Sequence, residues 1–190
     1  MSNRLHLASI VLLLAGLPVL SEAGKPDQTG AEAVKKPVSA SIVETKGRKL
    51  TPPAGNVRVK YADGSTDTWT TKGIAMEPQV GADGTVGWYV CATDAAGKLD
   101  LEGDDTPTPV ALVVCRGGKI VVTFKDLTNP RGWAFDPDGL HVMVYEGAKH
   151  GPGWVRRFDI KGGKETAQFS FADVDDAAKC PAWAKPFFEQ

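Results

Sequence analysis

The sequence predicts an all-β protein made of short antiparallel strands, and three observations support this prediction. The chain of 190 residues holds 21 glycines and 13 prolines, a composition typical of many strands joined by tight turns. Short apolar runs alternate with Asp-Gly and Gly-Gly pairs, which favour hairpin turns. Evidence for helices is confined to the C-terminal tail, at residues 173–179 and 181–185.

The first 23 residues have the features of a secretory signal peptide. Arg4 supplies a positive charge, residues 7–20 form a short apolar run, and Ser21-Glu22-Ala23 matches the small-residue pattern of a cleavage site. A retained N-terminal anchor is the alternative interpretation of this segment. No second apolar stretch approaches the roughly 20 residues that a transmembrane helix needs. We therefore expect a protein that is exported to the periplasm or secreted.

Residues 24–53 are rich in Lys, Pro, Ala, Ser and Thr, which predicts a flexible linker with a brief strand at residues 39–44. The predicted β-repeat domain follows at residues 54–190 and includes the C-terminal tail. The mature chain is long enough to bury a sizeable core.

The domain contains two copies of a unit of about 50 residues, followed by one further hairpin. The pair Asp83-Gly84 recurs as Asp138-Gly139, and Gly64 corresponds to Gly118. At Asp63-Gly64 we expect the type I′ turn that this residue pair favours. The predicted hairpins join residues 57–62 with 65–70, 75–80 with 85–91, 110–115 with 119–125, 131–135 with 140–145, and 154–160 with 164–171.

Apolar residues occupy both faces of two predicted strands, at residues 120–124 and 140–145. Such strands are typical of sheets that are covered on both sides, so we expect stacked sheets with these strands inside. We interpret the tail as a plug in which Trp183, Phe187 and Phe188 cover an apolar sheet edge.

Residues 133–139 are Trp-Ala-Phe-Asp-Pro-Asp-Gly and precede an apolar strand, a pattern that resembles the repeat of periplasmic Tol-type β-propellers. Residues 78–84 resemble a degenerate copy of this motif, and residues 158–164 resemble the ending of an outer strand of a propeller blade. The resemblance covers roughly residues 56–171. It implies blade-like antiparallel sheets but no particular activity, because propeller blades serve as scaffolds, binding surfaces and enzymes alike.

Closed propellers have about four to eight blades, more than the two units and one hairpin predicted here. Three arrangements therefore remain open. The blade-like sheets could pack face to face as a sandwich, which we favour because the last hairpin and the aromatic tail can cap it. A half-propeller could close into a ring as a homodimer, or the chain could be a fragment.

Three cysteines, Cys91, Cys115 and Cys180, lie in the mature chain, so an oxidising compartment favours one disulfide and one leftover thiol. Cys91 and Cys115 end two successive predicted strands. If these strands are antiparallel neighbours, the two side chains lie at opposite ends of the pair and cannot be bridged. We therefore predict a disulfide of Cys180 with Cys91 or Cys115.

The segment from Lys149 to Trp154 contains the most unusual loop of the chain, and this segment has no counterpart in the first repeat. We predict a binding site here, with Trp154 as an apolar anchor and Lys149, His150 and Arg156 as polar contacts. In the alternative interpretation the Gly-Pro-Gly turn only shapes the loop, and Trp154 packs in the core.

No motif in the sequence predicts catalytic residues, a cofactor or a metal site. Asp136 and Asp138 flank a proline in a turn, where aspartate is favoured because it accepts backbone hydrogen bonds. His141 lies within an apolar strand and is interpreted as a structural histidine. Residues 100–105 match only the first half of a Ca²⁺-binding loop, so we expect a solvated acidic loop there.

The formal net charge is −1 and the charges are interspersed, which argues against a nucleic-acid partner. We expect an exported, non-enzymatic β-repeat domain that binds another protein of the cell envelope. The second hypothesis is a small exported hydrolase or inhibitor-like protein whose site combines His150 with carboxylates from other loops.

Overall fold

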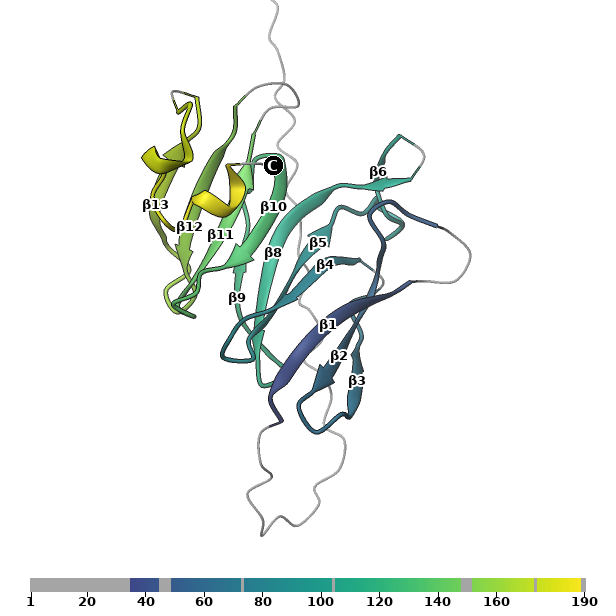
Figure 1. The fold of residues 1–190 in the computed structure, drawn as a ribbon. Helices are drawn as coiled ribbons and strands as arrows, with labels where there is room; N and C mark the ends of the chain where they lie inside the picture. Colours follow the sequence, from purple (N-terminus) through teal and green to yellow (C-terminus); the bar gives the residue numbers. More distant parts are fainter. Residues whose placement is uncertain are drawn as a thin grey trace, which may run out of the picture. The chain divides into compact units, whose positions relative to one another are not determined.

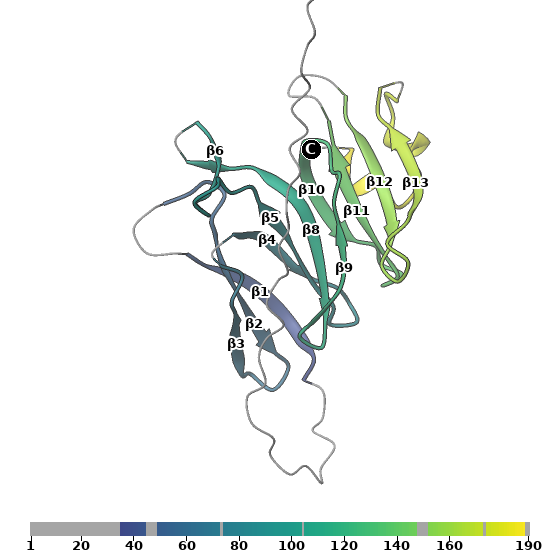
Figure 2. The ribbon, with the colours of Figure 1, turned by 180° about the vertical axis from the view of Figure 1, so that it is seen from behind.

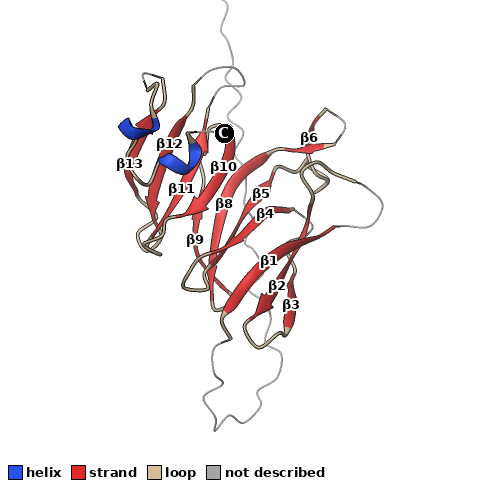
Figure 3. Ribbon diagram, viewed as in Figure 1, coloured by secondary structure: helices blue, strands red, loops and turns tan. Residues whose placement is uncertain are grey.

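Thirteen strands and two single-turn 3₁₀ helices make up the part of the chain that the computed structural model describes, residues 35–44, 49–72, 74–103, 105–147, 152–172 and 174–188 (Figures 1 and 3). The predicted signal peptide lies outside these residues, as does the predicted linker up to residue 34. Within the described ranges no helix is long and apolar enough to cross a membrane. The elements are β1 (Pro37–Glu44), β2 (Ala54–Tyr61), β3 (Thr66–Trp69), β4 (Ala75–Val80), β5 (Val86–Cys91), β6 (Leu101–Glu102), β7 (Thr106–Pro107), β8 (Pro109–Arg116), β9 (Lys119–Phe124), β10 (Pro130–Phe135), β11 (His141–Glu146), β12 (Trp154–Asp159), β13 (Glu165–Ser170), η1 (Ala177–Lys179) and η2 (Lys185–Phe187).

The strands of the described residues form three antiparallel sheets, none of which closes on itself (Figure 1 and, from behind, Figure 2). The largest has seven strands in the order β1-β2-β4-β5-β8-β9, with β3 paired to β2. The second is the four-stranded meander β10-β11-β12-β13, and β6 and β7 form a small ribbon. The brief strand predicted at residues 39–44 is confirmed as part of β1, which pairs with β2.

The two sheets share one apolar core, which confirms the sandwich-like, all-β prediction. Tyr89 and Leu112 of the large sheet contribute to it, as do Trp133, Val142 and Phe158 of the four-stranded sheet. A second cluster lies within the large sheet, around Val59 of β2, Trp88 of β5 and Val113 of β8. Burial of apolar side chains between and beside the sheets supplies the main driving force for this arrangement.

The chain contains two successive runs of four neighbouring strands, the meanders β4-β5-β8-β9 and β10-β11-β12-β13. In each meander an Asp-Gly turn, at Asp83-Gly84 or Asp138-Gly139, joins the first two strands. Gly117-Gly118 joins the last two strands of the first meander, and its equivalent in the second is the turn at residues 161–164. The predicted equivalence of Gly64 and Gly118 stays a prediction.

The turn at Asp63-Gly64 is not the predicted type I′. Only Gly64 has a positive φ, 83°, and its N–H donates to the carbonyl of Tyr61 at 3.0 Å. Asp63 instead accepts hydrogen bonds from the backbone and the hydroxyl of Ser65. This side-chain cap favours a turn in which the aspartate keeps a negative φ.

Strands β9 and β11 have opposite environments, although both are apolar on both faces. Every residue of β11 after His141 is buried, as predicted. In β9, by contrast, Ile120 and Val121 are 54% and 46% exposed. The prediction is wrong for β9 because this strand forms the edge of the large sheet and pairs only with β8 among the described residues.

The C-terminal tail covers a sheet face, not the sheet edge that was predicted. Phe187 is buried and stacks on Tyr145 of β11, with ring centroids 6.1 Å apart, and Trp183 packs at the rim of the same cluster. The ring of Phe188 contacts that of Phe171. Within the described tail, helical structure is limited to the single turns η1 and η2.

Candidate functional site

Two of the four predicted binding residues converge on one buried carboxylate. Glu146, the last residue of β11, is 0% exposed, and its Oε2 accepts a hydrogen bond from Trp154 Nε1 at 3.0 Å. Arg156 Nη1 lies 3.4 Å from the same oxygen, and Arg156 Nε donates to Glu165 at 2.8 Å. Trp154 and Arg156 therefore both stabilise the buried carboxylate of Glu146.

The other two predicted residues, Lys149 and His150, lie outside the described residues, and so does most of the loop that contains them. The recognition role of this loop therefore stays a prediction. Trp154 is half-buried, and its indole N–H donates a hydrogen bond to Glu146.

Glu146 also fixes the connection between β9 and β10. Its Oε1 accepts a hydrogen bond from the backbone N–H of Thr128 at 2.8 Å. Next to it, Asn129 has a positive φ of 50° and donates from its side-chain amide to the carbonyl of Gly147. These bonds hold the start of β10 against the end of β11. Asn129 and the first two residues of β10, Pro130 and Arg131, line one wall of a pocket.

The pocket has a volume of about 190 Å³ and is partly open to solvent. Met76 and Glu77 of β4 and Tyr89 of β5 line one side of it. The β6–β7 ribbon and the segment from Asn129 to Arg131 line the other sides. Strands of both main sheets therefore contribute to this pocket.

Glu77 has an unusual backbone at the pocket wall. Its φ is +49°, a conformation that costs free energy for a residue with a side chain, and it lies within the irregular pairing between Met76 and Gln79. The bulge turns the carbonyl of Glu77 towards the second sheet, where it accepts a hydrogen bond from Trp133 Nε1 at 3.0 Å. Gln79 Nε2 donates to the carbonyl of Trp133 at 2.6 Å, so β4 holds Trp133 at two points.

Two polar side chains at the pocket have no partner among the described residues. Tyr89 is 1% exposed, and its hydroxyl is the one buried side-chain polar atom there that makes no hydrogen bond. The carboxylate of Glu77 forms no ion pair there, and burial raises its pKa. Buried polar groups without partners are rare in folded proteins and call for an explanation.

The charges of two acidic side chains act on the Tyr89 hydroxyl. Burial raises the pKa of Tyr89 most, and the negative charges of Glu77 and Glu146 raise it further. The thiol of Cys91 lies in the same region of negative charge: burial and, after it, the charge of Glu77 raise its pKa to about 12. At neutral pH both groups are therefore protonated, and neither is an activated nucleophile.

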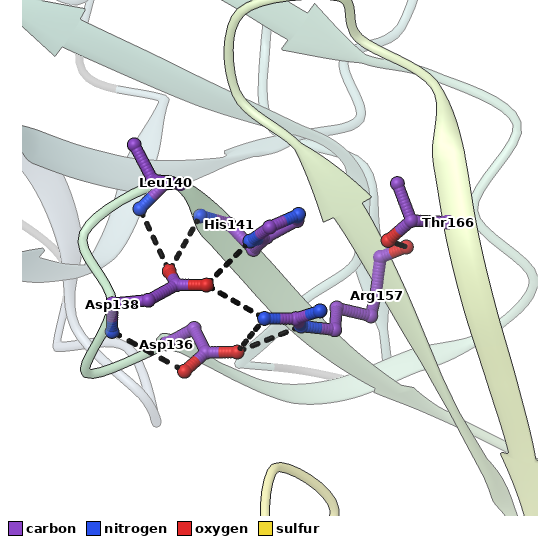
Figure 4. A network of polar contacts seen from close by, with 6 residues as sticks. All are labelled: Asp136, Asp138, Leu140, His141, Arg157 and Thr166. Atoms are coloured by element: carbon purple, nitrogen blue, oxygen red, sulfur yellow. Dashed lines mark hydrogen bonds and ion pairs between the residues drawn. The ribbon is translucent and has the colours of Figure 1, made fainter.

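A second polar cluster lies at the turn between β10 and β11 (Figure 4). Arg157 of β12 donates from Nε to Asp136 Oδ2 at 2.7 Å, and its Nη2 lies 2.6 Å from Asp138 Oδ2. His141 Nδ1 lies 2.6 Å from the same Asp138 oxygen, and Asp138 Oδ1 accepts the backbone N–H of Leu140 at 2.7 Å. The predictions that Asp138 caps the turn and that His141 is a satisfied structural histidine are both confirmed.

The ligand atoms of Asp136, Asp138 and His141 lie within 4.8 Å of one another, a spacing that could suit a metal ion. However, the Arg157 guanidinium already binds both carboxylates, so this cluster is an ion-pair network. The first meander has a simpler ion pair of the same kind, in which Arg116 of β8 binds Asp83 of the Asp-Gly turn at 2.7 Å. Because an arginine binds a turn aspartate in both meanders, we interpret this contact as one that holds the turn in place.

The three cysteines all lie among the described residues, are all buried, and form no disulfide there. Cys91 is opposite Pro109 and Cys115 is opposite Val86, which confirms that these two lie at opposite ends of neighbouring strands. The pairing of Cys180 with either of them stays a prediction.

Sequence reasoning missed Glu77, Tyr89 and Glu146. The only local signals were Glu77, a charged residue before Pro78 inside an apolar strand, and Glu146, which directly follows the predicted apolar strand at residues 140–145. Comparison with protein-family models, with curated proteins and with solved structures finds no match to this chain.

Proposed function

We propose that this chain is an exported binding module that acts in the periplasm or outside the cell and catalyses no reaction. Its two successive meanders support a description as two blade-like units of the propeller type, joined as a sandwich. In this proposal the pocket between β4, β5 and β10 takes a chemical group presented by a partner, which fits a protein of the cell envelope.

One observation carries the proposal: the buried Tyr89 hydroxyl has no hydrogen-bond partner among the described residues, and Tyr89 lines the pocket together with the half-buried Glu77. An unpartnered buried polar group costs folding free energy, roughly 1–3 kcal/mol. A ligand that supplies the missing hydrogen bonds would recover this cost. The same groups do not support catalysis, because both the tyrosine and the neighbouring Cys91 thiol stay protonated at neutral pH.

A pocket-filling substitution tests the proposal. Thr108 lines the pocket and is exposed, so Thr108→Trp blocks it without disturbing the core. Thr123→Trp is the matched control, since Thr123 is an exposed threonine on β9 that does not line the pocket. The probe is a panel of small amines, carboxylic acids and neutral amides, followed by backbone NMR shifts.

We expect at least one class of probe to shift the resonances of pocket residues in the wild type and in the Thr123→Trp variant. The Thr108→Trp variant should not respond. If no class binds, or if the Thr108→Trp variant binds as well as the control, the pocket is not a binding site.

A further inference from the structure

The geometry points to a ligand that carries a positive charge: the pocket recognises an ammonium or guanidinium group. This inference rests on the proposed binding function and adds the chemical class of the ligand. The recognising groups are the Glu77 carboxylate and the Tyr89 hydroxyl.

The Glu77 carboxylate supplies the charge complement. Glu77 is half-buried, and among the described residues no cation lies within ion-pairing distance of it. Burial of an unpaired carboxylate is unfavourable, and it is offset when a cation with good hydrogen-bond geometry comes close. A ligand ammonium group would be such a partner.

The Tyr89 hydroxyl supplies an independent observation. Tyr89 lines the pocket, and its hydroxyl is buried and has no hydrogen-bond partner among the described residues. A phenol oxygen can accept a hydrogen bond from an N–H donor. Because Glu77 and Glu146 both act on this hydroxyl with negative charge, a cationic donor is favoured there over a neutral one.

The other charges at the pocket agree with a cation. Glu102 also lines it, and Arg131 is the basic residue among the lining groups. Arg131 is exposed and forms no ion pair with the half-buried Glu77. An anionic ligand would have to approach Glu77, Glu102 and the region of Glu146 together.

The size of the pocket limits the ligand to a single small group. Sites for drug-sized molecules usually measure about 300–1,000 Å³. A volume of about 190 Å³ suits the end of one basic side chain or a short free amine. Both sources have the same chemistry, and the experiment can separate them.

The test is a calorimetric and NMR titration of the wild-type protein with butylammonium, butylguanidinium, butyrate and butanol. We expect the two cations to bind at the pocket and the other two probes to bind more weakly. Glu77→Gln should lower the affinity for the cations at least about tenfold, because a charge-assisted hydrogen bond is lost. Glu44→Gln is the control, since Glu44 is an exposed glutamate of β1 that does not line the pocket.

A second arm compares a short peptide that contains lysine with its norleucine counterpart. Tighter binding of the lysine peptide than of butylammonium would assign the site to a side chain of a protein partner. Equal binding would assign it to a free amine. Both results support the cation inference.

Two results would overturn the cation inference, and they differ in whether they also contradict the proposed binding function. If butyrate or butanol binds at the pocket as tightly as the cations, the charge preference is wrong but the binding function stands. If none of the four probes binds, and the broader panel also fails, both proposals fall. Tyr89→Phe adds a separate measure, since it removes only the hydroxyl and should weaken cation binding without unfolding the protein.

Discussion

Trp133 of β10 donates its indole N–H to the backbone carbonyl of Glu77 in β4, with Nε1 and O 3.0 Å apart. This bond joins the two main sheets at the wall of the pocket. Trp133 comes from the Trp-Ala-Phe-Asp-Pro-Asp-Gly segment, whereas Glu77 lies in the preceding meander. This segment therefore also positions a wall of the proposed site.

The close packing of Trp133 on Gly87 predicts a strong coupling between these two residues. A Cβ atom added at Gly87 would lie 2.6 Å from Trp133 Cη2, so Gly87→Ala should destabilise the protein by about 1–3 kcal/mol. In a Trp133→Phe background the cost should be much smaller, because the phenyl ring lacks the indole atom that clashes. Urea unfolding of the two single variants and the double variant measures this coupling. Equal costs in both backgrounds would contradict the packing described.

Arg157 and Arg116 each bind an aspartate of an Asp-Gly turn, and they should differ in how much they contribute to the free energy of unfolding. Arg157→Met leaves Asp136, which is 9% exposed, and Asp138 without their cation, so we expect a loss of about 1–3 kcal/mol. Arg116→Met is the matched control at the equivalent turn. The Arg116 side chain is 55% exposed, so its ion pair with Asp83 should contribute only about 0–1 kcal/mol. Chemical denaturation of both variants checks the order, and a larger loss for Arg116→Met would refute it.

Glu77→Gln should stabilise the free protein at pH 7. The folded-state pKa of Glu77 lies above its ordinary value of 4.5 because burial penalises the charged form. The native state therefore binds this proton more tightly than the unfolded state, and stability is lost as the pH rises through the folded pKa. Glutamine does not ionise, so the variant should melt above the wild type at pH 7.

Below pH 4.5 the two melting temperatures should converge, since Glu77 is then protonated in both states. Thermal melts at several pH values test this convergence. A variant that is less stable than the wild type at pH 7 would show that the carboxylate supports the fold, and would remove the reason to assign it a ligand.

The cysteines give a prediction about thiol reactivity. All three are buried, and burial raises the pKa of Cys91 and of Cys115 to about 12, so the native protein should resist alkylation at pH 8. After unfolding without a reductant, the predicted disulfide should leave one thiol to react with a colorimetric reagent, and peptide mapping should place Cys180 in the bridge with Cys91 or Cys115. A count of three reactive thiols would contradict this disulfide.

The sequence by itself determined the class of the fold and the positions of its Asp-Gly turns, because these depend on local interactions. Asp83-Gly84 and Asp138-Gly139 form turns since the aspartate caps the backbone and the glycine accepts a positive φ. The same local reasoning placed the strands on either side of these turns and interpreted His141 correctly.

Only the tertiary structure decided which apolar strand is an edge and where unpartnered polar atoms meet. Ile120 and Val142 look alike in the sequence, yet one is exposed and the other is buried, because sheet order depends on contacts between distant segments. In the same way Glu77 and Tyr89, on the successive strands β4 and β5, come near Glu146 of β11, which lies much further along the chain. Whether such a side chain finds a hydrogen-bond or ion-pair partner depends on contacts between distant segments. No local pattern of residue types can therefore predict it.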